Sequence, residues 1–152
     1  MKNYFIIGGL IFLTACGSNK KDEPEAAETD TVDAAFNWEA SLNDRTGQME
    51  VIKKEEAGPD SLTASAVIAF LYKKNPNVLL QFVKISGDTL YVSIPDAHYL
   101  TQQMGSTGPQ LYFAEAVYNL TEIPGIRYVN FDFEEGDHAS PAVLGRDDFK
   151  NR

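Results

Sequence analysis

The stretch VLLQFVKISGDTLYVSI, residues 78–94, decides the fold. It contains two apolar runs joined by Gly87-Asp88, and glycine readily supplies the positive φ that a two-residue hairpin turn requires. The stretch therefore predicts an antiparallel β-hairpin.

The turn also predicts which residues of the hairpin face each other. Ile85 would lie opposite Leu90, and Val83 opposite Val92, so that the aliphatic side chains share one face. The other face would carry Lys84, Tyr91 and Ser93.

A helix is predicted before the hairpin, over the alanine-rich residues 62–74. Asp60 or Ser61 would cap its free amides, and the helix would stop before Pro76. Lys73 and Lys74 suit its negative C-terminal end.

A second helix is predicted after the hairpin and the loop at residues 95–105. Thr107 and Gln110 have the spacing of a capping box, and a first turn tolerates Pro109. The apolar face would contain Phe113, Val117 and Leu120. Pro124-Gly125 would end this helix.

Three further strands are predicted from residues that alternate between apolar and polar. They lie at residues 36–42, more weakly at 48–54, and around Val129, Phe131 and Phe133. The resulting order is ββαββαβ. It predicts an α+β domain, with a mainly antiparallel sheet of about five strands and two helices on one face.

The N-terminus has the features of an export signal. A short positive start precedes the apolar residues 4–13, which are too few to span a bilayer. Leu13-Thr14-Ala15-Cys16 then resembles the bacterial lipobox. The resemblance implies a signal peptide over residues 1–15, cleavage between Ala15 and Cys16, a diacylglyceryl group on the Cys16 thiol and an acyl chain such as palmitate on the new amino group.

Residues 16–35 are predicted to form a lipidated, disordered acidic tether, because they hold too little apolar surface to offset the entropy of ordering. The string Lys20-Lys21-Asp22-Glu23 resembles the export signal of surface lipoproteins in the Bacteroidetes. The expected location is therefore the cell envelope, at the outer membrane, on either its periplasmic face or the cell surface.

Length and charge narrow the remaining possibilities. The 152-residue chain has room for one domain, residues 36–152, and carries a formal charge of −9. Lys2 is the only charged residue among residues 1–15, so their removal leaves a formal charge of −10. This acidic excess argues against nucleic-acid partners. Cys16 is the single cysteine, so an intrachain disulfide is impossible.

A second resemblance covers residues 78–136. It consists of Gly87-Asp88-Thr89-Leu90-Tyr91-Val92, Gly105-Ser106, and Leu120-Thr121-Glu122-Ile123-Pro124-Gly125-Ile126 with Val129. Together these segments are similar to the GerMN domain of sporulation and germination proteins, which is itself similar to ring-building motifs. The resemblance implies a small extracytoplasmic module with a structural or scaffolding role, not known as a catalytic domain. The last string also reads as an ordinary helix-to-strand junction.

We therefore expect a lipid-anchored envelope protein that is not an enzyme and needs no cofactor beyond its covalent lipid. Its partners would be the membrane, through the anchor, and an envelope protein or cell-wall component; self-association is possible. The alternative is an envelope hydrolase or metal-dependent enzyme that acts on cell-wall glycan.

Few residues suggest chemistry. A metal cluster or a glycosidase carboxylate pair could come from Asp132, Glu134, Glu135, Asp137 and His138, but a solvated acidic edge is the preferred interpretation. His98 or His138 could act as a base, but the serines at 86, 93, 106 and 140 fit turns, strands or caps. Exposed tyrosines could stack on sugars or anchor an interface; the candidates are Tyr91, Tyr99, Tyr112, Tyr118 and Tyr128.

Overall fold

The computed structural model describes residues 36–150. The predicted signal peptide, Cys16 and the tether lie outside the described residues. In chain order the elements are β1 (Asn37–Leu42), β2 (Met49–Lys54), α1 (Ala64–Lys74), β3 (Gln81–Ser86), β4 (Thr89–Ser93), the π-helix η1 (Tyr99–Gln103), α2 (Gly108–Leu120), β5 (Tyr128–Asp132), β6 (Ala142–Gly145) and the 3₁₀-helix η2 (Arg146–Phe149). The α+β class is confirmed, as is the order from β1 to β5; β6, η1 and η2 were not predicted.

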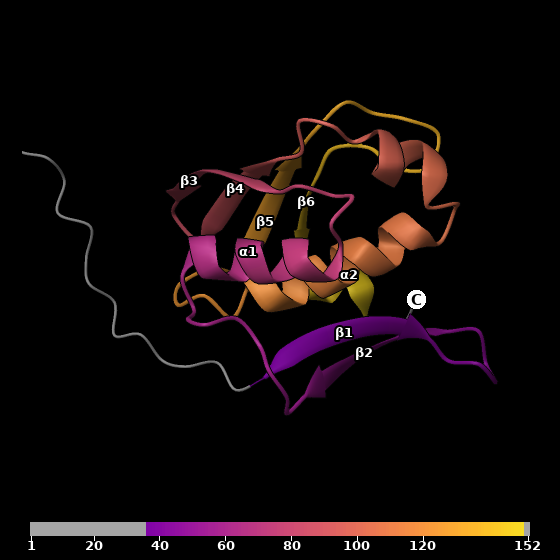
Figure 1. The fold of residues 1–152 in the computed structure, drawn as a ribbon, viewed down its shortest axis with the longest axis horizontal. Helices are drawn as coiled ribbons and strands as arrows, with labels where there is room; N and C mark the ends of the chain where they lie inside the picture. The colour runs from indigo at the N-terminus through magenta and orange to yellow at the C-terminus, as the bar shows by residue number, and fades with distance from the viewer. Residues whose placement is uncertain (1–35, 151–152) are drawn as a thin grey trace, which may run out of the picture.

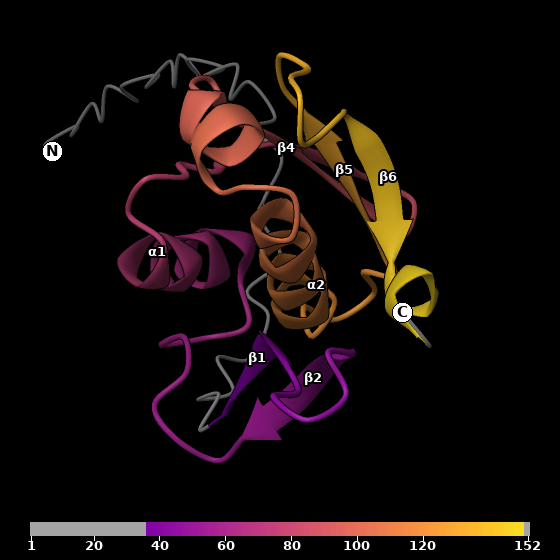
Figure 2. The same ribbon diagram turned by 90° about the vertical axis from the view of Figure 1, so that its right-hand side faces the viewer.

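The strands form two sheets where one was expected. Among the described strands, β1 and β2 pair only with each other, and the other four form a sheet in the order β3-β4-β5-β6. Pairing is mainly antiparallel, but β4 and β5 run parallel because the connection through α2 crosses over between them. Both helices lie on one side of the larger sheet, and no element of residues 36–150 covers its other face in Figure 2.

Helix α2 occupies the middle of the molecule. The four-stranded sheet lies on one side of it, α1 on another, and the β1-β2 hairpin beneath it (Figures 1 and 2). Neighbours on several sides bury more than the single apolar face that the sequence indicated. The buried residues of α2 are Pro109, Tyr112, Phe113, Ala114, Ala116, Val117, Asn119 and Leu120.

The hairpin of β3 and β4 forms as predicted at its turn. Gly87 has a φ of 61°, and Ile85 lies opposite Leu90. The expected pairing of Val83 with Val92 is wrong, because a bulge between residues 82 and 84 places Phe82 opposite Val92. A bulge inserts one residue into a strand and so shifts every pair that lies beyond it, counting from the turn.

Both predicted helix caps are also wrong in detail. The hydroxyl of Thr63, not Asp60 or Ser61, accepts from Ala66 N at 3.3 Å at the start of α1. Thr107 precedes α2 but has helical dihedral angles, and its side chain makes no capping bond. Among residues 36–150, no helix is long and apolar enough to cross a membrane.

Candidate functional site

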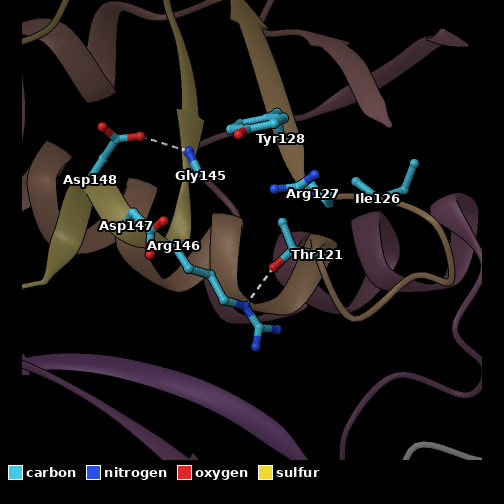
Figure 3. Close-up of a pocket in the computed structure, with 8 residues that line it drawn as sticks. All are labelled: Thr121, Ile126, Arg127, Tyr128, Gly145, Arg146, Asp147 and Asp148. Atoms are coloured by element: carbon cyan, nitrogen blue, oxygen red, sulfur yellow. Dashed lines mark hydrogen bonds between the residues drawn. The ribbon is translucent and has the colours of Figure 1, made fainter. Parts of the chain in front are cut away.

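A cavity of about 490 Å³ opens where β6, η2 and the segment after α2 meet (Figure 3). Its volume falls in the range of small-molecule sites. The lining residues are Thr121, Ile126, Arg127, Tyr128, Gly145, Arg146, Asp147 and Asp148.

Most charged groups around this cavity already have partners within the domain. Asp148 Oδ2 accepts from Gly145 N at 2.8 Å, and Asp147 pairs with Lys150. The side chain of Arg127 is 73% exposed; it makes a loose contact of 3.8 Å with Asp88 and lies 5.6 Å from the ring centroid of Tyr128. The cavity thus offers one largely exposed guanidinium, whereas a ligand site usually needs several convergent polar groups.

Arg146 extends out of the cavity and joins three parts of the fold (Figure 3). Its Nε donates to Thr121 Oγ1 at 2.7 Å, and its Nη2 donates to Tyr118 O at 2.9 Å and to Glu122 Oε1 at 2.5 Å. The guanidinium also lies 5.2 Å from the ring of Trp38 on β1, within cation–π range. Arg146 therefore fastens the C-terminal end of the domain to α2 and to the β1-β2 hairpin.

The carboxylate of Glu122 is the shared acceptor of this cluster. It also accepts from Trp38 Nε1 at 3.0 Å. Burial raises the pKa of Glu122, but the hydrogen bonds from Arg146 and Trp38, together with the positive charges of Arg146 and Lys53, outweigh it and hold the pKa below its ordinary value of 4.5.

This lowered pKa predicts how stability depends on pH. The contribution of Glu122 is fully present above the unfolded value of 4.5 and is lost as the pH falls through the lower folded value. We expect Glu122→Gln to lower the free energy of unfolding by about 1 kcal/mol at neutral pH, since the pair is partly exposed. The difference from the wild type should shrink toward zero once the pH has fallen below the lowered folded pKa of Glu122.

Urea unfolding at a series of pH values measures this difference. Glu55→Gln, at an exposed position, is the control and should follow the wild type throughout. A Glu122→Gln deficit that stays constant down to the lowest pH would contradict the assigned role of the ionised carboxylate.

Asn119 holds the β1-β2 hairpin against α2. Its Oδ1 accepts from Trp38 N at 3.0 Å, while its Nδ2 donates to Trp38 O at 2.8 Å and to Glu115 O at 2.8 Å. One side-chain amide thus satisfies both backbone groups of Trp38, as a neighbouring strand would. Sequence patterns missed this role, although a polar residue among the apolar residues of α2 was a usable signal.

Lys74 joins the same hairpin to both helices. Its Nζ lies 3.0 Å from Glu115 Oε1 and 3.2 Å from Glu39 Oε1, and it donates to Asn37 Oδ1 at 3.4 Å. Asn37 is 3% exposed, whereas Leu42 is 43% exposed. The apolar residues of β1 are therefore only partly buried. The contact with Lys74 instead buries Asn37, which belongs to the polar set of the strand.

The predicted metal and acid–base residues do not assemble into one site. Glu134, Glu135 and His98 line a small polar cavity of about 180 Å³ beside η1, while Asp132, Asp137 and His138 are not among its lining residues. Within residues 36–150, no group of three or more His, Cys, Asp and Glu side chains could hold a metal ion. Glu134 and Glu135 are adjacent in the chain, whereas a glycosidase pair acts from opposite sides of the scissile bond.

The other candidates are dispersed over the domain. Ser86 ends β3, Ser93 ends β4, and His138 donates its backbone N–H to Thr101 O at 3.0 Å. Among the five candidate tyrosines, Tyr112 is buried and Tyr128 is the most exposed, at 39%. Tyr91, Tyr99 and Tyr118 are half-buried.

The most distinctive surface of the domain is the edge strand β3. All six of its residues are exposed, and three are large and apolar: Phe82 at 51%, Val83 at 54% and Ile85 at 48%. Leu79, just before the strand, is 44% exposed. An edge strand leaves one side of its backbone unpaired, and long apolar edges readily add another strand.

Local charge sets this edge apart from the rest of an acidic chain. Residues 62–87, which include α1 and β3, contain no Asp or Glu but three lysines. Lys74 is paired with carboxylates from other segments, and Lys84 Nζ rests 4.7 Å from the ring centroid of Tyr91. We refer to residues 81–86 as the β3 edge. Three of its six residues are large and apolar, and none is acidic.

No family model matches the chain, and comparison with curated proteins and with solved structures gave no match either.

Proposed function

We propose that the chain is a lipid-anchored protein of the bacterial cell envelope, at the outer membrane, whose domain binds or scaffolds other envelope components without catalysis. Cys16 would carry the lipid after cleavage behind Ala15, and residues 17–35 would separate the domain from the membrane. The lipobox-like Leu13-Thr14-Ala15-Cys16 supports the location.

The observation that carries the binding role is the exposed β3 edge. A strand with six exposed residues, half of them large and apolar, is unusual on a free edge, because such edges are normally shortened, charged or covered. A partner that adds a strand there would gain backbone hydrogen bonds and bury Phe82 and Ile85. The α+β fold agrees with the scaffolding module that the GerMN resemblance implies.

Anchoring would make even weak binding effective. A short flexible tether holds its domain at an effective concentration of about 1 mM near partners on the same membrane. The lipid would therefore hold the domain at the membrane surface, and the β3 edge would determine which partner it binds there.

A photo-crosslinking amino acid at position 82 tests this role in intact cells. We expect adducts with envelope proteins, and we expect Ile85→Glu to reduce them strongly because a charge would be placed on the pairing edge. Position 143 on β6 is the matched control, since Val143 is 54% exposed at the opposite edge of the sheet. Equal adduct patterns at positions 82 and 143 would contradict a specific β3 surface.

A further inference from the structure

We infer that the β3 edge pairs antiparallel with the β3 edge of a second copy of this chain, joining two four-stranded sheets into one of eight strands. The inference rests on the proposed function, because it names the partner that the same edge binds. Pairing about a twofold axis presents the same surface patch from both copies, so the edge must be complementary to itself.

The bulge in β3 creates this self-complementarity. Residues directly opposite each other in a pair point to the same face, so Phe82 and Ile85 both lie on the face of Val92 and Leu90, which are buried. Without the bulge, positions three apart would point to opposite faces. A twofold axis between Val83 and Lys84 then places Phe82 of each copy across from Ile85 of the other.

This register forms two equivalent pairs, in each of which Phe82 of one copy and Ile85 of the other bury each other. Phe82 is 51% and Ile85 48% exposed in the single chain. An aromatic ring facing a β-branched side chain is a favourable cross-strand pair. Because the axis is perpendicular to the sheet, the helices of both copies lie on the same face and their cores become continuous.

Charge also selects this edge for self-association. The chain carries −9 overall, so most contacts between two copies would bring carboxylates together. Residues 62–87 contain none, and two copies that meet along β3 avoid this repulsion. The other edge, β6, has four residues and leads into η2, where Asp147 and Asp148 follow Arg146.

Lys84 does not block the edge. Its partner in the hairpin is Tyr91, and its Nζ lies 4.7 Å from the centroid of that ring, over the neighbouring strand β4. The ammonium group is therefore held to the side by a cation–π contact and not directed at the second copy.

The pair is expected to be weak in solution and significant on a membrane. A single strand edge is smaller than a standard protein interface, so we expect a dissociation constant between about 1 μM and 1 mM. Tethering two copies to one membrane supplies an effective concentration at the upper end of that range.

Cysteine pairs test the register in the full chain as it is produced in cells. We would co-express Phe82→Cys and Ile85→Cys chains with different tags and oxidise the membranes. The two cysteines would face each other across the twofold axis, within disulfide reach. We expect a disulfide between the two different chains, and at least a tenfold weaker product when either variant is expressed alone.

A cysteine on the opposite edge of the sheet is the control for this crosslinking experiment. Val143→Cys on β6 should not crosslink to either variant. Membrane-bound chains that give no 82–85 product, or that crosslink equally through position 143, would overturn the pairing while leaving the proposed function intact. Chains absent from the membrane would instead count against the proposed anchor.

Sedimentation equilibrium gives a second measurement that needs no cysteine. The chain from residue 16 onward, with Cys16→Ser, should form dimers as its concentration rises toward about 1 mM. Ile85→Glu should raise the dissociation constant at least tenfold, and Val143→Glu should not change it. A wild-type chain that stays monomeric over this range would overturn the proposal.

Discussion

Replacing Asn119 with alanine is expected to lower the free energy of unfolding by about 3 kcal/mol and to detach the β1-β2 hairpin from α2. The substitution removes two hydrogen bonds to the backbone of Trp38 and leaves its N–H and C=O unpaired in a partly buried position. Each unsatisfied group costs about 1–3 kcal/mol, which is why the loss exceeds that of one exposed hydrogen bond.

Trp38 provides a direct readout of this change. It is the only tryptophan of the chain, so its fluorescence reports the environment of β1 specifically. Detachment would separate the indole from Tyr118, whose ring centroid lies 5.1 Å away, and would expose it to water. We expect a red-shifted emission in native buffer together with the lower unfolding free energy.

Asn77→Ala is the matched control, because Asn77 is exposed in the loop between α1 and β3. It should change the free energy of unfolding by less than about 0.5 kcal/mol. An Asn119→Ala chain with wild-type stability and wild-type emission would show that the hairpin is held by other contacts.

Replacing Cys16 with alanine is expected to abolish lipid attachment completely. Lipidation requires a thiolate nucleophile, and Cys16 is the only thiol in the chain. A single acyl chain binds membranes only marginally, at about 0.8 kcal/mol per buried methylene, whereas two or more give a stable anchor. The variant would lose the anchor in full.

Metabolic labelling with an alkyne fatty acid measures this loss. The wild type should incorporate the label and the Cys16→Ala chain should not. Thr14→Ala keeps a small residue beside the cleavage position and should retain labelling. Equal labelling of the Cys16→Ala chain would mean that the lipid is attached elsewhere or that the label is unspecific.

The sequence predicted the local structure of this domain well where a residue type or pattern indicates one particular local conformation. Gly87 marked the β3-β4 turn, and it has the required positive φ. The alternating Val129, Phe131 and Phe133 marked β5, and all three are buried. Proline and alanine content placed both helices to within a few residues.

The arrangement of the strands was harder to predict. Alternation in β1 looks the same whether the strand packs on a sheet or on a helix, so the division into two sheets was not visible. The role of Asn119 depends on a contact with Trp38, 81 positions away in the chain. β6 is four residues long, too short for its pattern to stand out.

The candidate binding surface shows the same limit. The aliphatic residues of β3 predicted an apolar face shared with β4, yet those of β3 are all exposed because β3 lies at the edge of the sheet. A pattern of side chains indicates which face is apolar but not which strand ends the sheet. The bulge, which moves Phe82 opposite Val92, was equally hidden, since it depends on the pairing of β3 with β4.

Mass spectrometry of the N-terminal peptide, isolated from the membranes of producing cells, tests the proposed anchoring most directly. The account predicts that the chain begins at Cys16 and carries the mass of a diacylglyceryl group on sulfur, with a further acyl chain on the amino group. A chain in which an unmodified Cys16 still follows Ala15, or one that begins at another residue, would contradict it.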